Sequence, residues 1–132
     1  MKCLDLKTEK RILHVGCGNS ELQDKLYEEG YHKIDNIDIS AVVIDQMNKS
    51  KELKGYSEMT FEVMDVKEMR YKDQSFDMVL DKSTIDTLMC TDNPILNVAK
   101  MTEEIYRVLK DDGVYFVLSY ASPSTRLEHI TR

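Results

Sequence analysis

The chain has 132 residues, of which 42% are apolar and 32% are charged, the composition of a soluble globular protein. This length predicts one domain, residues 1–132, with a single sizeable core. The formal net charge is −6 and the sequence contains no basic run. We therefore expect no nucleic-acid partner, because phosphate contacts need clustered Lys and Arg.

Strand and helix patterns alternate from the start of the chain. Residues 12–15 form a short apolar run typical of a strand, and the helix that follows is capped by Ser20 and ends at Gly30. Residues 34–39 predict a second strand, and Ser40 caps a second helix.

The second half of the chain continues this alternation. A short helix is expected over residues 84–89. A longer helix begins at Pro94 and runs to Leu109, with apolar residues three or four positions apart, and a turn over residues 111–113 follows it. The remaining predicted strands are apolar runs: residues 59–66, 76–80 and 114–118.

These elements define a fold class. Strands this apolar are typical of parallel strands buried on both faces. Repeated strand–helix–strand units imply right-handed crossovers. The sequence therefore predicts the α/β class, with a doubly wound, mainly parallel, Rossmann-like sheet.

Glycines and acids follow the first four predicted strands. In a doubly wound sheet, ligands bind beyond the carboxyl ends of the strands, so residues there share one pocket. The set begins with small residues that let a ligand approach the backbone and continues with single carboxylates: Gly16, Cys17, Gly18 and Asn19, then Asp38, Asp65 and Asp81.

Each of these residues also has a plain structural interpretation. Asp38 follows Gly18 by 20 residues, a spacing suited to binding both ribose hydroxyls, but it is also explained as a loop acid or a helix cap. Asp65 suits an adenine amino group or is an isolated loop acid. Asp81 faces the cationic end of a ligand or caps the helix over residues 84–89. Their common register on successive strands favours a nucleotide pocket.

Residue 21 helps to select the nucleotide. A dinucleotide site has a small residue at the third position of Gly-x-Gly-x-x-Gly, where this chain has Glu21. A carboxylate in the first turn of the helix repels a pyrophosphate. S-adenosylmethionine has no phosphate, and its sulfonium and ammonium groups are cationic, so the acids around the site favour it.

Several stretches resemble the cofactor motifs of class I methyltransferases: residues 14–20 (HVGCGNS), 36–40 (NIDIS), 64–66 (MDV) and 76–86 (FDMVLDKSTID). Residues 109–113 (LKDDG) resemble the turn before the fifth strand of that family. The first and last motifs together are similar to those of the methyltransferase-like enzymes that modify lysines of translation elongation factor 1-alpha. The resemblance extends from about Arg11 to Ser119.

The resemblance implies five strands in the order 3-2-1-4-5, with S-adenosylmethionine as cofactor and S-adenosylhomocysteine as product. It also implies a protein substrate with an acceptor lysine, possibly on elongation factor 1-alpha. The implied cofactor-binding residues are Gly16, Cys17, Gly18 and Asn19 at the methionine part, Asp38 at the ribose, Ile39, Asp65 and Val66 at the adenine, and Asp81 and Lys82 at the methionine end.

The catalytic residues stay unassigned. Asp86 and Tyr120 are suited to orient a lysine amine, but a helix-surface acid and a buried strand tyrosine explain them as well. Cys17 is either a reactive thiol or a small residue at a crowded turn. Many class I enzymes have an acid at the position of His14, which we interpret as a core residue, and Ser83 replaces a glycine usual in the elongation-factor group, which we expect to be tolerated.

The ends of the chain lead to a further expectation. Family members carry a segment that closes over the cofactor before the first strand, and two strands after the fifth. We expect this chain to lack both, which leaves residues 114–118 as an edge that invites self-association. The alternative to an active enzyme is therefore a non-catalytic or truncated module that binds the cofactor or a partner protein.

The three cysteines, Cys3, Cys17 and Cys90, lie far apart in the sequence. This pattern predicts neither a disulfide framework nor a metal site, and it favours a reducing, cytoplasmic location. The longest apolar stretches are far shorter than a membrane span, and Met1 is not followed by a secretory signal, so no membrane association is expected.

Overall fold

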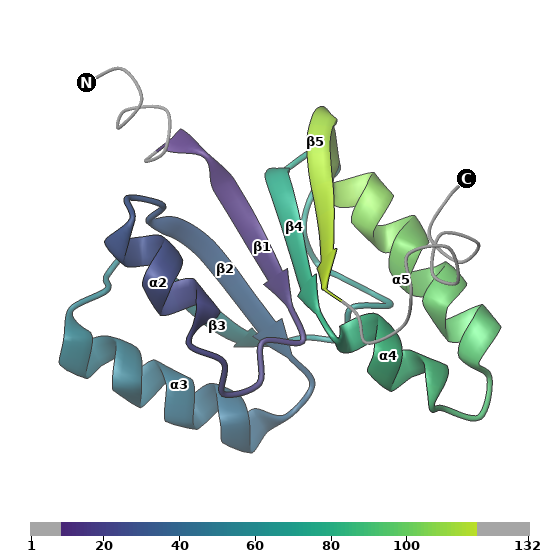
Figure 1. Ribbon diagram of the computed structural model, residues 1–132, viewed down its shortest axis with the longest axis horizontal. Helices are drawn as coiled ribbons and strands as arrows, with labels where there is room; N and C mark the ends of the chain where they lie inside the picture. The colour runs from purple at the N-terminus through teal and green to yellow at the C-terminus, as the bar shows by residue number, and fades with distance from the viewer. Residues whose placement is uncertain (1–8, 119–132) are drawn as a thin grey trace.

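The computed structural model describes residues 9–118. In chain order its named elements are β1 (Arg11–Val15), α2 (Leu22–Glu28), β2 (Lys33–Asp38), α3 (Ala41–Lys54), β3 (Thr60–Val63), β4 (Phe76–Lys82), α4 (Thr84–Met89), α5 (Pro94–Val108) and β5 (Leu109–Leu118). The five strands form one parallel sheet in the order β3-β2-β1-β4-β5 (Figure 1). The predicted fold class and strand order are confirmed.

Helices cover both faces of this sheet (Figure 1). Successive side chains of a strand point to opposite faces. Thus Leu13 of β1 joins a buried cluster with α4 and α5, whereas the adjacent Ile12 joins a second cluster with Ile44 of α3. Burial on both faces explains why the strands are nearly continuous apolar runs.

The helix starting at Pro94 follows its predicted pattern. Pro94 lies at the helix N-terminus, and the residues that α5 buries recur at intervals of three or four. They are Val98, Met101, Thr102, Ile105 and Val108.

Several predicted boundaries were wrong. β3 ends at Val63 rather than at residue 66. α5 ends at Val108, and β5 begins at Leu109, so it includes the predicted turn over residues 111–113. An irregularity in the register accommodates that turn: Phe76 pairs with Leu109 and Met78 with Val114, so a two-residue step on β4 matches a five-residue step on β5.

The predicted helix caps have different outcomes. The Ser40 hydroxyl accepts a hydrogen bond from the Val43 N–H at 3.4 Å and caps α3 as predicted. Ser20 is not the N-cap of α2, because Glu21 occupies that position. The Ser20 hydroxyl nevertheless accepts a hydrogen bond from the Leu22 N–H at 3.1 Å. Gly30, with φ of 109°, follows the end of this helix as expected.

His14 is a core residue, as predicted, with 1% of its surface exposed. Its Nδ1 lies 3.0 Å from Oδ1 of Asn36, and the Asn36 side-chain amide donates to the Thr60 carbonyl at 3.0 Å. Burial lowers the pKa of His14, although the contact with Asn36 opposes this effect. These two polar side chains therefore join β1, β2 and β3 within the sheet.

Between residues 9 and 118, the structure has no helix long and apolar enough to cross a membrane.

Candidate functional site

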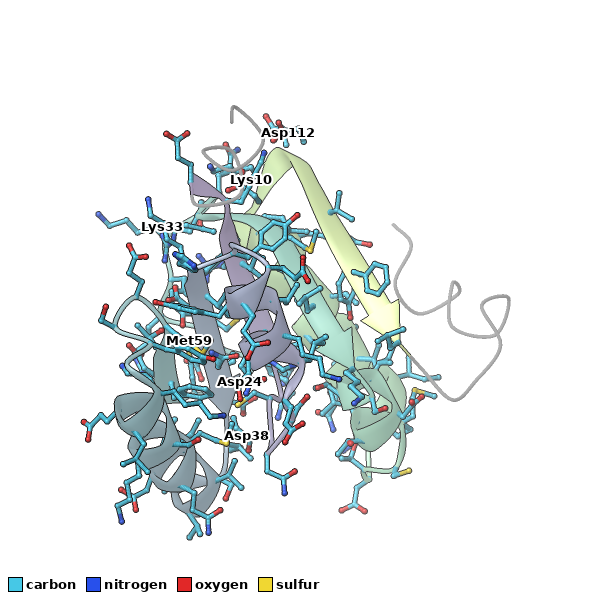
Figure 2. The ribbon with its side chains drawn as sticks, turned by 60° about the vertical axis from the view of Figure 1, so that its left-hand side comes forward. Lys10, Asp24, Lys33, Asp38, Met59 and Asp112 are labelled. Atoms are coloured by element: carbon cyan, nitrogen blue, oxygen red, sulfur yellow. The ribbon has the colours of Figure 1, made fainter. Side chains whose placement is uncertain are left out.

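A hollow of about 240 Å³ lies at the carboxyl edge of the sheet. Asp38 lies at this edge, whereas Lys10, Lys33 and Asp112 lie near the opposite one (Figure 2). Loops after four strands and the start of α4 contribute the lining: Gly16, Asp38, Ile39, Met64, Asp65, Val66, Lys67, Lys82, Ser83, Thr84, Thr87 and Leu88. We call this the carboxyl-edge hollow. It brings together six of the ten predicted cofactor residues: Gly16, Asp38, Ile39, Asp65, Val66 and Lys82.

Two glycines shape the loop after β1, for different reasons. Both have left-handed backbones, with φ of 60° at Gly16 and 52° at Gly18. A Cβ on Gly16 would overlap the side chain of Thr84, whose hydroxyl donates to the Val15 carbonyl at 2.9 Å. A Cβ on Gly18 would have no heavy atom within 4 Å. Gly16 therefore permits close packing against α4, and Gly18 leaves open space.

The Asp38 carboxylate connects the loops after β1 and β2. Its Oδ2 accepts a hydrogen bond from the Gly18 N–H at 2.9 Å, and its Oδ1 accepts one from the Ser40 N–H at 2.9 Å. A carboxylate has about four acceptor positions, so each oxygen retains capacity for another donor. The loop-acid interpretation and the ligand-binding interpretation of Asp38 are thus compatible.

The lining of the carboxyl-edge hollow also combines apolar surface with an ion pair. Ile39 is 71% exposed, which is unusual for a large apolar side chain, and the neighbouring Val66 is buried. Oδ1 of Asp65 accepts from the Lys67 N–H at 2.9 Å, and Oδ2 lies 3.1 Å from Lys67 Nζ. A flat apolar ligand with an amino group suits this part of the lining.

Asp81 does not line the carboxyl-edge hollow. Its side chain is 1% exposed, and Oδ1 accepts from the N–H groups of Thr84 at 2.7 Å and Ile85 at 3.3 Å. The Tyr115 hydroxyl donates to Oδ2 at 2.7 Å. Burial raises the pKa of Asp81, although these donors oppose the rise. The geometry supports the helix-capping interpretation of this residue.

Three further predicted residues lie near the hollow without lining it. Gly18 bonds to Asp38, and Asn19 is exposed. Cys17 is 2% exposed, and burial, with the Asp38 charge, raises the pKa of its thiol to about 12. Because a thiol with this pKa stays protonated at neutral pH, the structure favours Cys17 as a small residue at a crowded turn.

The predicted cofactor-binding residues did not include α4 or its N-cap, although the motif over residues 76–86 reaches this helix. Ser83, Thr84, Thr87 and Leu88 all line the carboxyl-edge hollow. Ser83 has φ of 69°, a conformation that favours glycine. In the sequence, the one sign of this left-handed backbone was that Ser83 stands where the elongation-factor group usually has a glycine. Asp86 lies in the first turn of α4 but outside the lining, and Tyr120 lies outside the described residues.

Across the described part of the chain, no group of three or more His, Cys, Asp or Glu side chains is arranged to hold a metal ion.

Comparisons with known proteins agree with this architecture. The family profile described as a methyltransferase domain matches residues 6–131. The chain is 42% identical over 118 residues to the eEF1A lysine and N-terminal methyltransferase of Bos taurus, covering 88% of this chain and 17% of that protein. It is 30% identical over 133 residues to EEF1A lysine methyltransferase 4 of Mus musculus, covering 95% of this chain and 51% of that protein. A solved structure of a putative sarcosine dimethylglycine methyltransferase from Galdieria sulphuraria superposes with a TM-score of 0.74 at 21% identity, covering 88% of this chain and 42% of that one.

Proposed function

The chain belongs to the class I S-adenosylmethionine-dependent methyltransferases, and from this premise we propose that it is cytoplasmic, binds this cofactor in the carboxyl-edge hollow and methylates a lysine of a protein related to elongation factor 1-alpha. S-adenosylmethionine is the cofactor of the family, and S-adenosylhomocysteine is the product it leaves. The proposed substrate class is taken from the names of the relatives. This chain spans only 17% of the length of the bovine relative.

The position of Asp38 carries the proposal. Its carboxylate lies in the carboxyl-edge hollow, bonded to the N–H groups of Gly18 and Ser40 with acceptor capacity remaining. The two hydroxyls of a ribose are suited to that capacity. Exposed Ile39 lies one residue away and offers an apolar surface to a purine.

The hollow also suits the charge of the cofactor. The open space beside Gly18 admits a chain close to the backbone. The lining combines two carboxylates, Asp38 and Asp65, with Lys67 and Lys82, and this mixture suits a cofactor that itself carries cationic groups and a carboxylate. Glu21 at the N-cap of α2 adds a carboxylate where a dinucleotide would place its phosphates.

When bound, S-adenosylmethionine would supply an activated methyl group, on a positively charged sulfur, for transfer to a neutral amine. The chain has to hold the two reactants in line and keep water from the amine, which must be neutral to attack. Asp38 would hold the ribose, and Ile39 and Val66 would shield the purine from water. This chemistry does not require a dedicated general base.

Binding and methyl transfer test the proposal separately. Calorimetry with S-adenosylhomocysteine measures binding, and transfer of a radiolabelled methyl group to elongation factor 1-alpha measures activity. We expect Asp38→Ala to weaken binding by at least about tenfold, since hydrogen bonds to a charged group are lost. Asp45→Ala is the matched control, because Asp45 is an exposed acid on α3 paired with Lys49. Unchanged binding in Asp38→Ala would contradict the cofactor site, and binding without methyl transfer would support the non-catalytic alternative.

We also propose that the chain self-associates through β5. Among residues 9–118, this strand pairs with β4 alone. Val114, Phe116 and Leu118 are each between 43% and 51% exposed, and no Lys or Pro interrupts residues 114–118. Light scattering should give a mass above that of a monomer, and Phe116→Lys should reduce it. A monodisperse wild-type monomer would contradict this proposal.

A further inference from the structure

The segment between β3 and β4, residues 64–75, forms no helix or named strand, and its first four residues, 64–67, line the carboxyl-edge hollow. It starts where the Met64 N–H donates to the Asp38 carbonyl at 3.1 Å. It then makes a tight turn, in which the Glu68 N–H donates to the Asp65 carbonyl at 3.0 Å. We call residues 64–69 the crossover wall. Because it lacks a helical or sheet ladder of its own, its position depends on contacts with other elements.

Two side chains of α5 hold the end of the crossover wall. The Met69 N–H donates to Oε2 of Glu104 at 3.1 Å, and the Met69 carbonyl accepts from Nη2 of Arg107 at 3.1 Å. Both polar backbone groups of one loop residue are therefore bonded to a single turn of a distant helix. The Met69 side chain is buried in the core cluster beneath this point.

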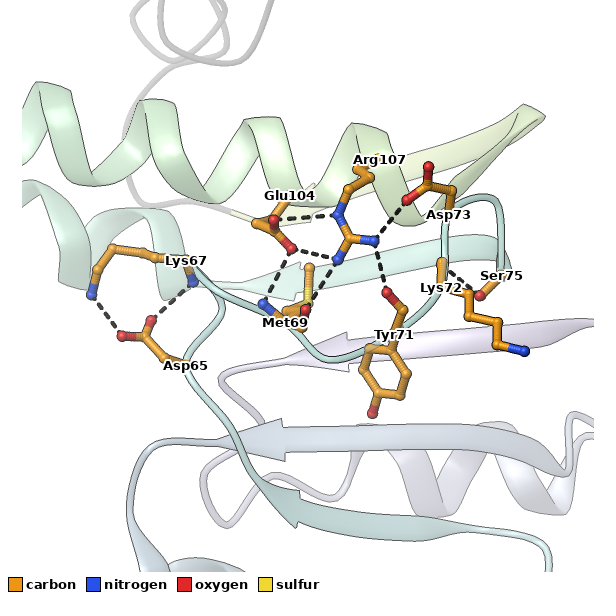
Figure 3. A network of polar contacts seen from close by, with 9 residues as sticks. All are labelled: Asp65, Lys67, Met69, Tyr71, Lys72, Asp73, Ser75, Glu104 and Arg107. Atoms are coloured by element: carbon orange, nitrogen blue, oxygen red, sulfur yellow. Dashed lines mark hydrogen bonds and ion pairs between the residues drawn. The ribbon is translucent and has the colours of Figure 1, made fainter.

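Arg107 connects this contact to the rest of the segment (Figure 3). Its guanidinium donates to the Tyr71 carbonyl at 2.7 Å and to Oδ1 of Asp73 at 2.9 Å. It also donates to both carboxylate oxygens of Glu104, at 2.7 and 3.3 Å. With Met69 included, all five N–H donors of the arginine are used. A lysine at this position would offer one compact charge in place of a planar fork.

We infer that Glu104 and Arg107 are positioning residues for the cofactor: by fixing Met69 they hold the turn of Asp65 and Val66 in place and so set the selectivity of the hollow for adenine. This inference rests on the proposed function. Glu104 and Arg107 lie outside the lining and act on the ligand only through the crossover wall. A loosened wall would present the Asp65 carboxylate less accurately to an amino group on a purine.

Ligand selectivity separates positioning from general stability. We would measure by calorimetry the affinities for S-adenosylhomocysteine and for S-inosylhomocysteine, which has an oxo group in place of the adenine amino group. Wild type should prefer S-adenosylhomocysteine by about tenfold, the value of one charge-assisted hydrogen bond. Arg107→Lys and Glu104→Gln should each reduce this preference to about threefold or less. Glu103→Gln, an exposed neighbour on the same helix, is the matched control and should retain it.

Hydrogen exchange provides a readout that needs no ligand. Residues 64–75 should exchange faster in Arg107→Lys and Glu104→Gln than in Glu103→Gln, with β2 unchanged. Folded variants with the wild-type preference, or with equal losses for both ligands, would overturn the inference. If wild type binds neither ligand, the proposed function fails, and hydrogen exchange alone then tests the positioning role. Unchanged exchange over residues 64–75 in the two variants would overturn that role as well.

Discussion

The carboxyl-edge hollow has two sides that are held in place in different ways. The glycine wall is made of Gly16 and Asp38 in the lining and of Gly18, which donates to Asp38 from outside the lining. It is set by positive φ angles and by hydrogen bonds between adjacent strand ends. The crossover wall, residues 64–69, depends on Glu104 and Arg107, which follow Met69 by 35 and 38 residues. One side of a binding site can thus be specified by neighbouring loops while the other depends on a distant helix.

This difference suggests how each side responds to mutation. In the glycine wall a single added methyl group meets backbone strain or a neighbouring side chain, because there is little freedom to adjust. In the crossover wall, loss of a side-chain contact releases a segment that has no helical or sheet ladder of its own to keep it in place. We therefore expect the glycine wall to govern stability and the crossover wall to govern selectivity.

The largest effect is expected for Gly16→Ala. The new Cβ would be strained by the left-handed backbone and would displace the Thr84 side chain from the Val15 carbonyl. We expect a loss of about 2–4 kcal/mol in the free energy of unfolding, from strain and overpacking together. Chemical denaturation measures it.

Gly18→Ala is the control for this change. It has nearly the same φ but no neighbour near the added Cβ, so the strain of about 1–2 kcal/mol should act alone. Its methyl group would instead obstruct the space left for the cofactor, which should weaken binding of S-adenosylhomocysteine. Equal destabilisation by the two substitutions would contradict the packing role of Gly16.

The same contrast explains how far the sequence could predict the site. Regular apolar runs identified the strands, and Gly16 and Asp38 were selected because strand ends carry recognisable residue types. The strand order and Ile39 came from the resemblance to class I methyltransferases. The Asp81 carboxylate was ambiguous until the structure placed it beneath α4, bonded to Thr84 and Tyr115. Contacts such as that of Glu104 with Met69 have no local signature, since they depend on how α5 packs against the sheet. The start of β5 was misplaced for a related reason, because Leu109 pairs with Phe76 of β4 ahead of the turn over residues 111–113, which the irregularity in the register accommodates.

A smaller effect should appear in the pH dependence of stability, through His14 beneath the glycine wall. Its folded-state pKa is lowered from 6.5, so the unfolded chain binds a proton more readily. The contribution of neutral His14 to the free energy of unfolding is therefore fully present above pH 6.5 and is lost as the pH falls below 6.5. The loss is at most about 1.4 kcal/mol per pH unit. Denaturation series at pH 7.5 and 5.5 should show a steeper loss in wild type than in His14→Leu. Equal slopes would contradict the buried, neutral state of His14.

The smallest effect is expected for Ser83→Gly, at the start of α4. Glycine removes the cost of a left-handed φ of 69° but adds entropy to the unfolded chain. We expect a net gain of about 0.5–1 kcal/mol in stability. Gln74→Gly, at φ of 52° and outside the hollow, measures the same backbone effect elsewhere, together with the loss of an exposed 3.4 Å hydrogen bond from the Gln74 amide to Asp111. A loss of stability in Ser83→Gly alone would indicate that the serine side chain makes a contact worth more than the strain.

The identity of the ligand is tested most directly by comparing S-adenosylhomocysteine with NAD. Thermal unfolding of the wild-type chain would be followed with each compound at matched concentrations. We expect S-adenosylhomocysteine to raise the melting temperature, because a ligand that binds the folded state stabilises it. NAD should not raise it, because the Glu21 carboxylate at the N-cap of α2 opposes a pyrophosphate. A larger rise with NAD than with S-adenosylhomocysteine would contradict the assignment of the hollow to a methyl-donor cofactor.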